Sequence, residues 1–363
     1  MKDRVKNIFK NAVSKPDIIL IKNSSEPFID NNFFYTTGLH KGLFEGSIAI
    51  LFPDGNIDII VSELESETAK KADVNICVYK NQSEYSKILQ QSISNSKNIG
   101  VNFKAITYND FYNFNKKFSD LKFLDVSESF EKTRLVKDEI EINLIKKACN
   151  IVDKVVEKIP ELLCENIKEY ELAAEIDYLM QKNGADKAAF ETISSFGKNT
   201  SEPHYSHGST ILKASDFVLC DFGACHKKYN SDITRTFVFG KTSEIQIEMY
   251  KTVLDAQGLA FENSKSGVKA SDVHNIVDSF INSTKFKGRF IHSTGHSLGL
   301  SVHDGNARLS QFSNLILEEN MVFTIEPGIY LPGFGGVRIE DDVLIKKNGI
   351  EILTKSSKQL IEI

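Results

Sequence analysis

Short apolar runs alternate with amphipathic segments over the first 130 residues of the chain. Two of these runs flank Pro53-Asp54-Gly55, a combination typical of a tight β-hairpin. The expected strands are 17–23, 46–52, 56–62 and 98–103, and the expected helices are near 83–95 and 108–118. This alternation predicts an α/β domain that occupies residues 1–130.

A long amphipathic helix is expected to follow Asp138, because apolar residues recur there with helical spacing. The residues on this face are Ile145, Ala148, Cys149, Val152, Val155, Val156 and Ile159. Pro160 is expected to end the helix, and Cys149 is therefore expected in the core rather than in a reactive site. A second helix is expected over 168–182, closed by a left-handed cap at Asn183–Gly184.

The remainder of the chain consists of strand-like runs and glycine-rich loops, interrupted by expected helices near 245–262 and 271–283. This mixture predicts a second domain over residues 131–363.

The chain has a net charge of -5 and 41% hydrophobic residues, as in ordinary globular proteins, and it lacks the clustered basic residues of a nucleic-acid surface. No apolar stretch suits a signal peptide or a membrane helix, and the five cysteines show no CxxC spacing. We therefore expect a cytoplasmic protein with free thiols that binds neither nucleic acid nor membrane.

Two segments place acidic residues symmetrically about a turn. The pairs are Asp221 with Asp232, about a centre near His226–Lys227, and Glu326 with Glu340, about Gly333. Antiparallel pairing would set each pair opposite on one face of a sheet, where like charges are destabilising. No cluster of Lys or Arg nearby could compensate all four, so divalent cations are the simplest counter-charge. The alternative is that these carboxylates are solvated at exposed strand ends.

Three histidines, His292, His296 and His303, lie within twelve residues of a glycine-rich segment. Gly295 and Gly299 disfavour a helix, and no HExxH motif is present, which excludes a zincin. The cluster favours metal ligation and proton transfer, although a lone histidine is more often a satisfied polar residue. Four carboxylates with one histidine favour Mn²⁺, Co²⁺ or Fe²⁺ over a thiolate-type zinc site, and their number suggests two ions.

The segments LCDFGA, SDITRTF, HSTGHSLGLSVHD and TIEPGIYLPGFGGVRIEDDVLI resemble the pita-bread metallopeptidases, in particular the Xaa-Pro aminopeptidases and prolidases. The resemblance extends from about residue 133 to the end. The region that contains FFYTTGL resembles the creatinase-type N-terminal domain of the same family. The resemblance implies a creatinase-like α/β domain, an α+β pita-bread catalytic domain, a homodimer, and hydrolysis of the bond that precedes proline.

The resemblance also implies roles for individual residues. The metal ligands would be Asp221, Asp232, His296, Glu326 and Glu340, with Asp232 and Glu340 bridging two divalent ions, Mn²⁺ first and Co²⁺, Fe²⁺ or Zn²⁺ as alternatives. Glu326 would act as general base and then acid, and His204 and His303 would hydrogen-bond either the developing tetrahedral oxyanion or the proline carbonyl. His292 would either pack beside the site or contact the substrate. Thr234 and Arg235 would support the strands that carry the ligands.

Arg308 bears on the length of the substrate. Prolidases of the dipeptidase type resemble this segment in having an Arg shortly after the VH(D/E) motif that binds the free carboxylate of Xaa-Pro, although the spacing here is one residue longer. A guanidinium there favours a dipeptide, whereas an Xaa-Pro aminopeptidase acting on longer peptides has no need of it. A solvated surface Arg is the alternative. More remote alternatives are creatinase, a methionine aminopeptidase and a catalytically inactive pita-bread binding module.

Overall fold

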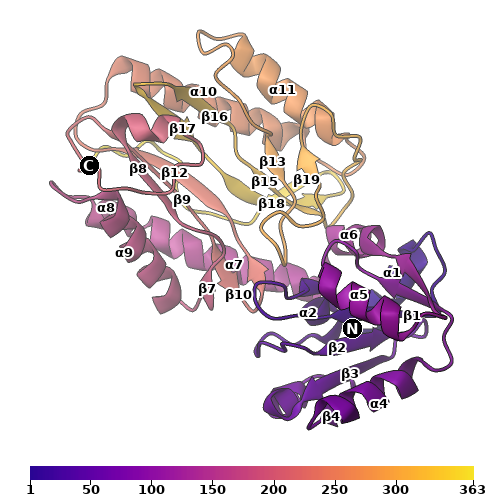
Figure 1. Ribbon diagram of the computed structural model, residues 1–363. Coiled ribbons are helices and arrows are strands. Elements are labelled where there is room, and N and C mark those ends of the chain that lie inside the picture. Colours follow the sequence, from indigo (N-terminus) through magenta and orange to yellow (C-terminus); the bar gives the residue numbers. More distant parts are fainter. The chain divides into compact units, whose positions relative to one another are not determined.

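The computed structural model describes residues 1–363, which divide into two units, Met1–Arg134 and Leu135–Ile363. The first unit contains a six-stranded sheet of order β4-β3-β2-β1-β5-β6, in which β2 is antiparallel to both its neighbours and the other adjacent strands are parallel (Figure 1). Its strands are β1 (Ile18–Lys22), β2 (Ile48–Leu51), β3 (Ile57–Ser62), β4 (Asn75–Tyr79), β5 (Asn98–Val101) and β6 (Lys122–Asp125). Its helices are α1 (Lys2–Asn11), α2 (Asn31–Thr37), η1 (Glu63–Glu65), α3 (Ser66–Ala69), α4 (Gln82–Ile93), α5 (Tyr108–Lys117) and α6 (Ser127–Leu135).

The strands and helices expected in the first unit are confirmed, including the hairpin at Pro53, where Gly55 has a φ of 94°. Seven elements of the first unit were not predicted: α1, α2, η1, α3, β4, β6 and α6. All but one residue of α2 are buried, so the helix has no polar face, and the edge strands β4 and β6 are only partly covered, which removes the alternation of a half-buried strand. The remaining four are the terminal helix α1, the short elements η1 and α3, and the connecting helix α6.

The second unit holds more, and shorter, strands. Its helices are α7 (Glu139–Val156), α8 (Ile159–Leu162), α9 (Glu169–Lys182), η2 (Gly197–Ser201), α10 (Glu244–Asn263) and α11 (Ala270–Asn282). Its strands are β7 (Lys187–Ala188), β8 (Ile193–Phe196), β9 (Phe217–Phe222), β10 (Ala224–His226), β11 (Tyr229–Asn230), β12 (Ile233–Val238), β13 (Gly295–His296), β14 (Arg308–Leu309), β15 (Val322–Ile325), β16 (Gly328–Leu331), β17 (Gly335–Arg338), β18 (Asp341–Lys346) and β19 (Gly349–Ile352). No helix of the chain combines the length and the apolarity needed to cross a membrane.

Helix α7 shows how the sequence produces a buried face. Asp138 and Glu141 form a capping box at its start, and the predicted apolar positions along it, Cys149 included, are buried. The prediction for its end is wrong in detail. The helix stops at Val156, and Pro160 lies in the first turn of α8, where a missing N–H leaves no hydrogen bond unmade. The predicted left-handed cap after α9 is confirmed by Gly184, with a φ of 104°.

Two pairs of helices cover the strands of the second unit from opposite sides (Figure 1). Helices α7 and α9 share one core with β8, β9 and β12, and α10 and α11 share another with β15, β17 and β18. The strands that carry the predicted ligands therefore lie between two apolar layers. Their inward-facing carboxylates are largely removed from water, which makes their electrostatic environment decisive.

Candidate active site

The first pair of predicted acids lies on the hairpin of β9 to β12. Its register differs from the prediction, because Asp221 stands opposite Thr234 rather than Asp232. Cys225 stands opposite Asn230, so the turn is centred between Lys227 and Lys228, both with positive φ (50° and 73°). The predicted centre was one residue too early. Side chains alternate along a strand, so Asp232 still lies on the same face as Thr234, as a diagonal neighbour of Asp221.

The second pair matches its predicted register. Ile325 stands opposite Asp341 between β15 and β18, and Gly328 stands opposite Arg338 between β16 and β17. In both ladders the paired residues are equally far from Gly333. Glu326 and Glu340 lie between the two ladders, and the common register places them opposite each other. The opposed arrangement predicted for these two glutamates is confirmed.

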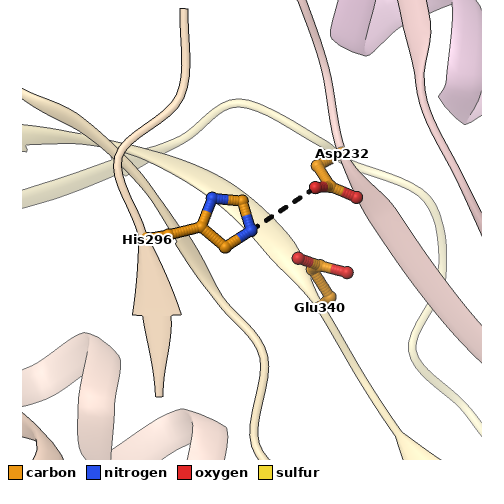
Figure 2. Close-up of side chains that lie close together, drawn as sticks. All are labelled: Asp232, His296 and Glu340. Atoms are coloured by element: carbon orange, nitrogen blue, oxygen red, sulfur yellow. Dashed lines mark ion pairs between the residues drawn. The ribbon is translucent and has the colours of Figure 1, made fainter. Parts of the chain in front are cut away.

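Three side chains from separate segments converge where the hairpins meet. The ligand atoms of Asp232, His296 and Glu340 all lie within 4.8 Å of one another. Figure 2 shows the His296 ring directed at Asp232 with Glu340 beside them. His296 Nε2 lies 3.6 Å from Asp232 Oδ2 and 3.7 Å from Glu326 Oε1, so a fourth predicted ligand borders the cluster.

The main chain at His296 is held very close to β15. Its N–H donates to Thr324 Oγ1 at 3.1 Å, and a Cβ on the preceding residue, Gly295, would lie 1.9 Å from the Thr324 carbonyl oxygen. Only glycine allows this approach. The glycine-rich histidine segment is non-helical here, as its composition predicts.

A buried arginine that the sequence reasoning did not assign lies beside the acids. Arg338 Nη2 donates to Asp221 Oδ2 at 2.6 Å, and the same guanidinium donates to Thr234 Oγ1 and to the Tyr330 hydroxyl. The Thr234 hydroxyl in turn donates to Glu340 Oε2 at 2.6 Å. Of the four carboxylates, Asp221 thus forms a hydrogen-bonded ion pair with a cationic side chain of the protein. Arg338 is a single basic residue and not part of a cluster of Lys or Arg, so the sequence did not predict a cation beside these acids.

The expected supporting role of Arg235 is confirmed by its contacts. Arg235 is buried, and its guanidinium donates to the Glu340 carbonyl oxygen at 2.6 Å and to Asp341 Oδ1 at 2.7 Å. Behind the cluster, Asp342 Oδ2 accepts from the Asp232 N–H at 2.9 Å and lies 3.3 Å from Cys149 Sγ. These contacts fix the strands that bear Asp232 and Glu340.

Burial governs the protonation of the cluster. It raises the pKa of Asp232 and of Glu340 well above their usual values, and the neighbouring carboxylates raise each further. Burial likewise raises the pKa of Glu326 to about 8. The pKa of His296 is lowered to about 3 by burial and then by His303, so its imidazole is neutral.

This arrangement fits divalent metal ions. Asp221 Oδ1 and Asp232 Oδ1 are buried acceptor atoms without any hydrogen-bond donor. Four crowded carboxylates and a neutral imidazole supply oxygen and nitrogen ligands that need a shared positive charge. A metal centre satisfies the unpartnered oxygens and relieves the repulsion together.

All nine predicted site residues line a single cavity of about 820 Å³. They are His204, Asp221, Asp232, His292, His296, His303, Arg308, Glu326 and Glu340. The remaining walls are largely apolar and include Phe190, Ile193 and Val302. The structure therefore brings together residues that are up to 136 positions apart (340 − 204) in the chain.

The histidines and Arg308 occupy different settings in this cavity. The His303 ring lies beside that of His296, with centroids 4.1 Å apart and ring planes tilted by 57°, and Arg308 in β14 pairs with His296 in β13. Both ring nitrogens of His292 are engaged, Nε2 with the Tyr330 hydroxyl at 2.9 Å and Nδ1 with the Ser293 carbonyl at 2.8 Å. His292 is therefore a fixed part of the wall, whereas the Arg308 guanidinium forms no hydrogen bond or ion pair with the protein.

Comparison with known proteins gives consistent relatives. Residues 143–347 match the model of metallopeptidase family M24, and residues 13–136 match the creatinase/prolidase N-terminal domain. The Xaa-Pro dipeptidase of Pyrococcus horikoshii is 38% identical over 364 residues, with 99% of each chain covered. The crystal structure of the prolidase from that organism gives a TM-score of 0.88 at 37% identity and covers 99% of this chain and 100% of its own. An X-Pro aminopeptidase from Thermotoga maritima gives a TM-score of 0.91 at 31% identity, with 96% and 98% covered.

Proposed function

The chain belongs to metallopeptidase family M24, and on this premise we propose that it is an Xaa-Pro dipeptidase, a prolidase that hydrolyses the peptide bond preceding proline. The observation that carries the proposal is the single cavity in which the five metal-ligand candidates lie together with Arg308. The Xaa-Pro dipeptidases of Pyrococcus horikoshii and Pyrococcus furiosus, which match over nearly the whole chain, carry this activity in their names.

Two divalent ions would be held by Asp221, Asp232, His296, Glu326 and Glu340. The oxygen-rich donor set favours Mn²⁺, with Co²⁺, Fe²⁺ or Zn²⁺ as alternatives. Bound ions would supply Lewis acidity to the scissile carbonyl and to the attacking water. The buried, unpartnered oxygens of Asp221 and Asp232 support this assignment.

Glu326 would handle the proton. Its carboxyl lies at the cavity, where burial raises its pKa to about 8, within reach of ordinary solution pH. It would take a proton from the attacking water and pass it to the leaving nitrogen. Proline nitrogen carries no hydrogen in the peptide bond and must gain one to leave as an amine, so this delivery is required.

His303 and His204 would act on the carbonyl side of the reaction. Both line the cavity, and burial lowers the pKa of His303, which keeps its imidazole neutral. A neutral ring has one N–H to donate, and that donor would stabilise the negative charge that develops on the carbonyl oxygen. His292 would shape the cavity through its contact with Tyr330.

Arg308 would set the length of the substrate. The cavity holds two guanidinium groups, but that of Arg338 is already bonded to Asp221, Thr234 and Tyr330. The unpaired Arg308 group would bind the free carboxylate at the end of an Xaa-Pro dipeptide. The second candidate function, Xaa-Pro aminopeptidase, is favoured by the fold similarity to the Thermotoga maritima enzyme.

The deciding experiment compares Leu-Pro with Leu-Pro-Gly in the presence of Mn²⁺. A dipeptidase should have a much higher kcat/KM for Leu-Pro, and Arg308→Ala should raise its KM for the dipeptide by about tenfold or more while changing kcat less. Arg289→Ala, at an exposed arginine outside the cavity, is the matched control. Equal kcat/KM for the two peptides would make the enzyme an Xaa-Pro aminopeptidase instead.

Assembly and location complete the proposal. The family resemblance favours a homodimer, which sedimentation of the metal-loaded protein would test. The five cysteines are all unpaired, which favours a reducing compartment such as the cytoplasm.

A further inference from the structure

A second cavity, of about 260 Å³, lies wholly within the N-terminal unit. Lys22 and Tyr79, the last residues of β1 and β4, line it together with residues of α4 and α5. Strands β1 and β4 run in the same direction, since β2 is antiparallel to both β1 and β3, and β3 is parallel to β4. The cavity therefore lies at the carboxyl edge of the sheet, where α/β proteins most often bind their ligands.

Lys22 provides a cation with unused bonding capacity. Its Nζ donates to the Asn23 carbonyl at 2.6 Å and to the Gly46 carbonyl at 2.8 Å, which leaves one of its three N–H groups for a ligand. Burial lowers the pKa of Lys22 to about 8, against the opposing effect of Asp110. An anion in the cavity would therefore be bound by an ammonium group that is short of solvent.

Helix α5 contributes charges of both signs to the cavity. Asp110 and Lys117 both line the cavity, and Asp110 Oδ2 accepts from the Thr107 hydroxyl at 2.7 Å, which leaves its other oxygen available. The cavity is also lined by Leu89 and Phe114, both of which are buried. A complementary ligand has a carboxylate, an ammonium group and an apolar body.

We propose that this pocket binds a free α-amino acid with an apolar side chain. Its carboxylate contacts Lys22 and Lys117, its ammonium group contacts Asp110, and its side chain lies against Leu89 and Phe114. A simple anion leaves Asp110 as a repulsive neighbour, and a simple amine leaves both lysines uncompensated. The volume is about a third of that of the catalytic cavity, which suits one amino acid rather than a peptide.

The test is equilibrium dialysis of labelled L-leucine against the full chain in excess EDTA, which removes metal-dependent binding at the other site. We expect saturable binding of one leucine per chain at millimolar concentrations or below. N-acetyl-L-leucine, which lacks the ammonium group, and isopentylamine, which lacks the carboxylate, should each bind about tenfold more weakly or worse. Phosphate should not compete.

Variants assign the binding to this pocket. Asp110→Asn and Lys117→Met should each weaken leucine binding by about tenfold, with folding checked by circular dichroism. Lys116→Met, at an exposed neighbour on the same helix that does not line the pocket, and Arg308→Ala in the catalytic cavity should leave binding unchanged. No saturable binding, equal binding of N-acetyl-L-leucine, or unchanged binding in Asp110→Asn would each overturn the proposal.

Discussion

The two acidic hairpins of the second unit both bring buried carboxylates close together, but the charges around those carboxylates differ. Asp221 and Asp232 are set off diagonally by a two-residue turn, and Asp221 has an arginine partner. Glu326 and Glu340 stand directly opposite each other, and burial and neighbouring acids raise the pKa of Glu340 well above its usual value. Arg338 is thus hydrogen-bonded to Asp221, whereas it only opposes the raised pKa of Glu326 and of Glu340 through its charge and forms no hydrogen bond to either. Two hairpins that each place a pair of acids about a turn in the sequence can therefore differ in the charges that surround those acids.

The largest expected effect is the loss of activity when Asp232 is changed, compared with the same change at another acid near its hairpin. Asp232→Asn should abolish turnover, with a loss of about 10³-fold or more in kcat/KM, because Asp232 lies at the centre of the ligand cluster. The measurement is hydrolysis of Leu-Pro with Mn²⁺ supplied. Asp186→Asn makes the same acid-to-amide change near the tip of the hairpin, outside the cavity, and should retain activity. Substantial turnover by Asp232→Asn would remove it from the metal site.

When metal is absent, the change from Asp to Asn should affect the free energy of unfolding differently at Asp221 and at Asp232. Asp221→Asn leaves the buried Arg338 without its anion and should lower the free energy of unfolding by about 3 kcal/mol. Asp232→Asn removes one of several crowded carboxylates and should leave stability unchanged or raise it. Urea unfolding in EDTA measures both. Equal destabilisation by the two variants would show that Arg338 does not distinguish Asp221 from Asp232.

The glutamate hairpin should give the metal-free protein a pH-dependent stability. The pKa of Glu326 is about 8 in the folded chain against 4.5 as its ordinary value, so the folded state binds more protons than the unfolded state between these limits. The contribution of Glu326 to the free energy of unfolding should therefore fall as pH rises from about 4.5 to 8, by up to about 5 kcal/mol, since each pKa unit corresponds to about 1.4 kcal/mol. Urea titrations in EDTA across this range test it. Glu326→Gln should flatten the slope, and an equally steep slope in that variant would exclude Glu326 as its source.

The smallest effect concerns the turn that offsets the aspartates. Lys227 and Lys228 both have positive φ, which Asn-Gly adopts at lower cost. Replacing the pair with Asn-Gly should raise the free energy of unfolding by about 0.5–1 kcal/mol without affecting kcat/KM, since the register is kept. Thermal unfolding and the Leu-Pro assay measure the two quantities. Lower activity would mean that the register around Asp221 had changed.

These details mark how far the sequence could predict the molecule. The predicted fold class, the family and the opposed glutamates are confirmed, because long periodic segments and a turn centred on Gly333 carry strong local signals. The aspartate register was missed because Lys227–Lys228 lacks the glycine or asparagine that usually marks such a turn. Arg338 was missed because its pairing with Asp221 spans 117 residues and arises only from packing. The roles given to the nine site residues stay predictions until variants are assayed.

The wide separation of the ligand candidates also bears on how the protein acquires metal. Asp221 and Glu340 are 119 residues apart (340 − 221), and Glu340 is the last of the five to leave the ribosome. A nascent chain can offer only scattered single carboxylates until β15 and β18 have paired. At the proposed metal site, loading would therefore follow folding, because the ligands come together only in the folded chain.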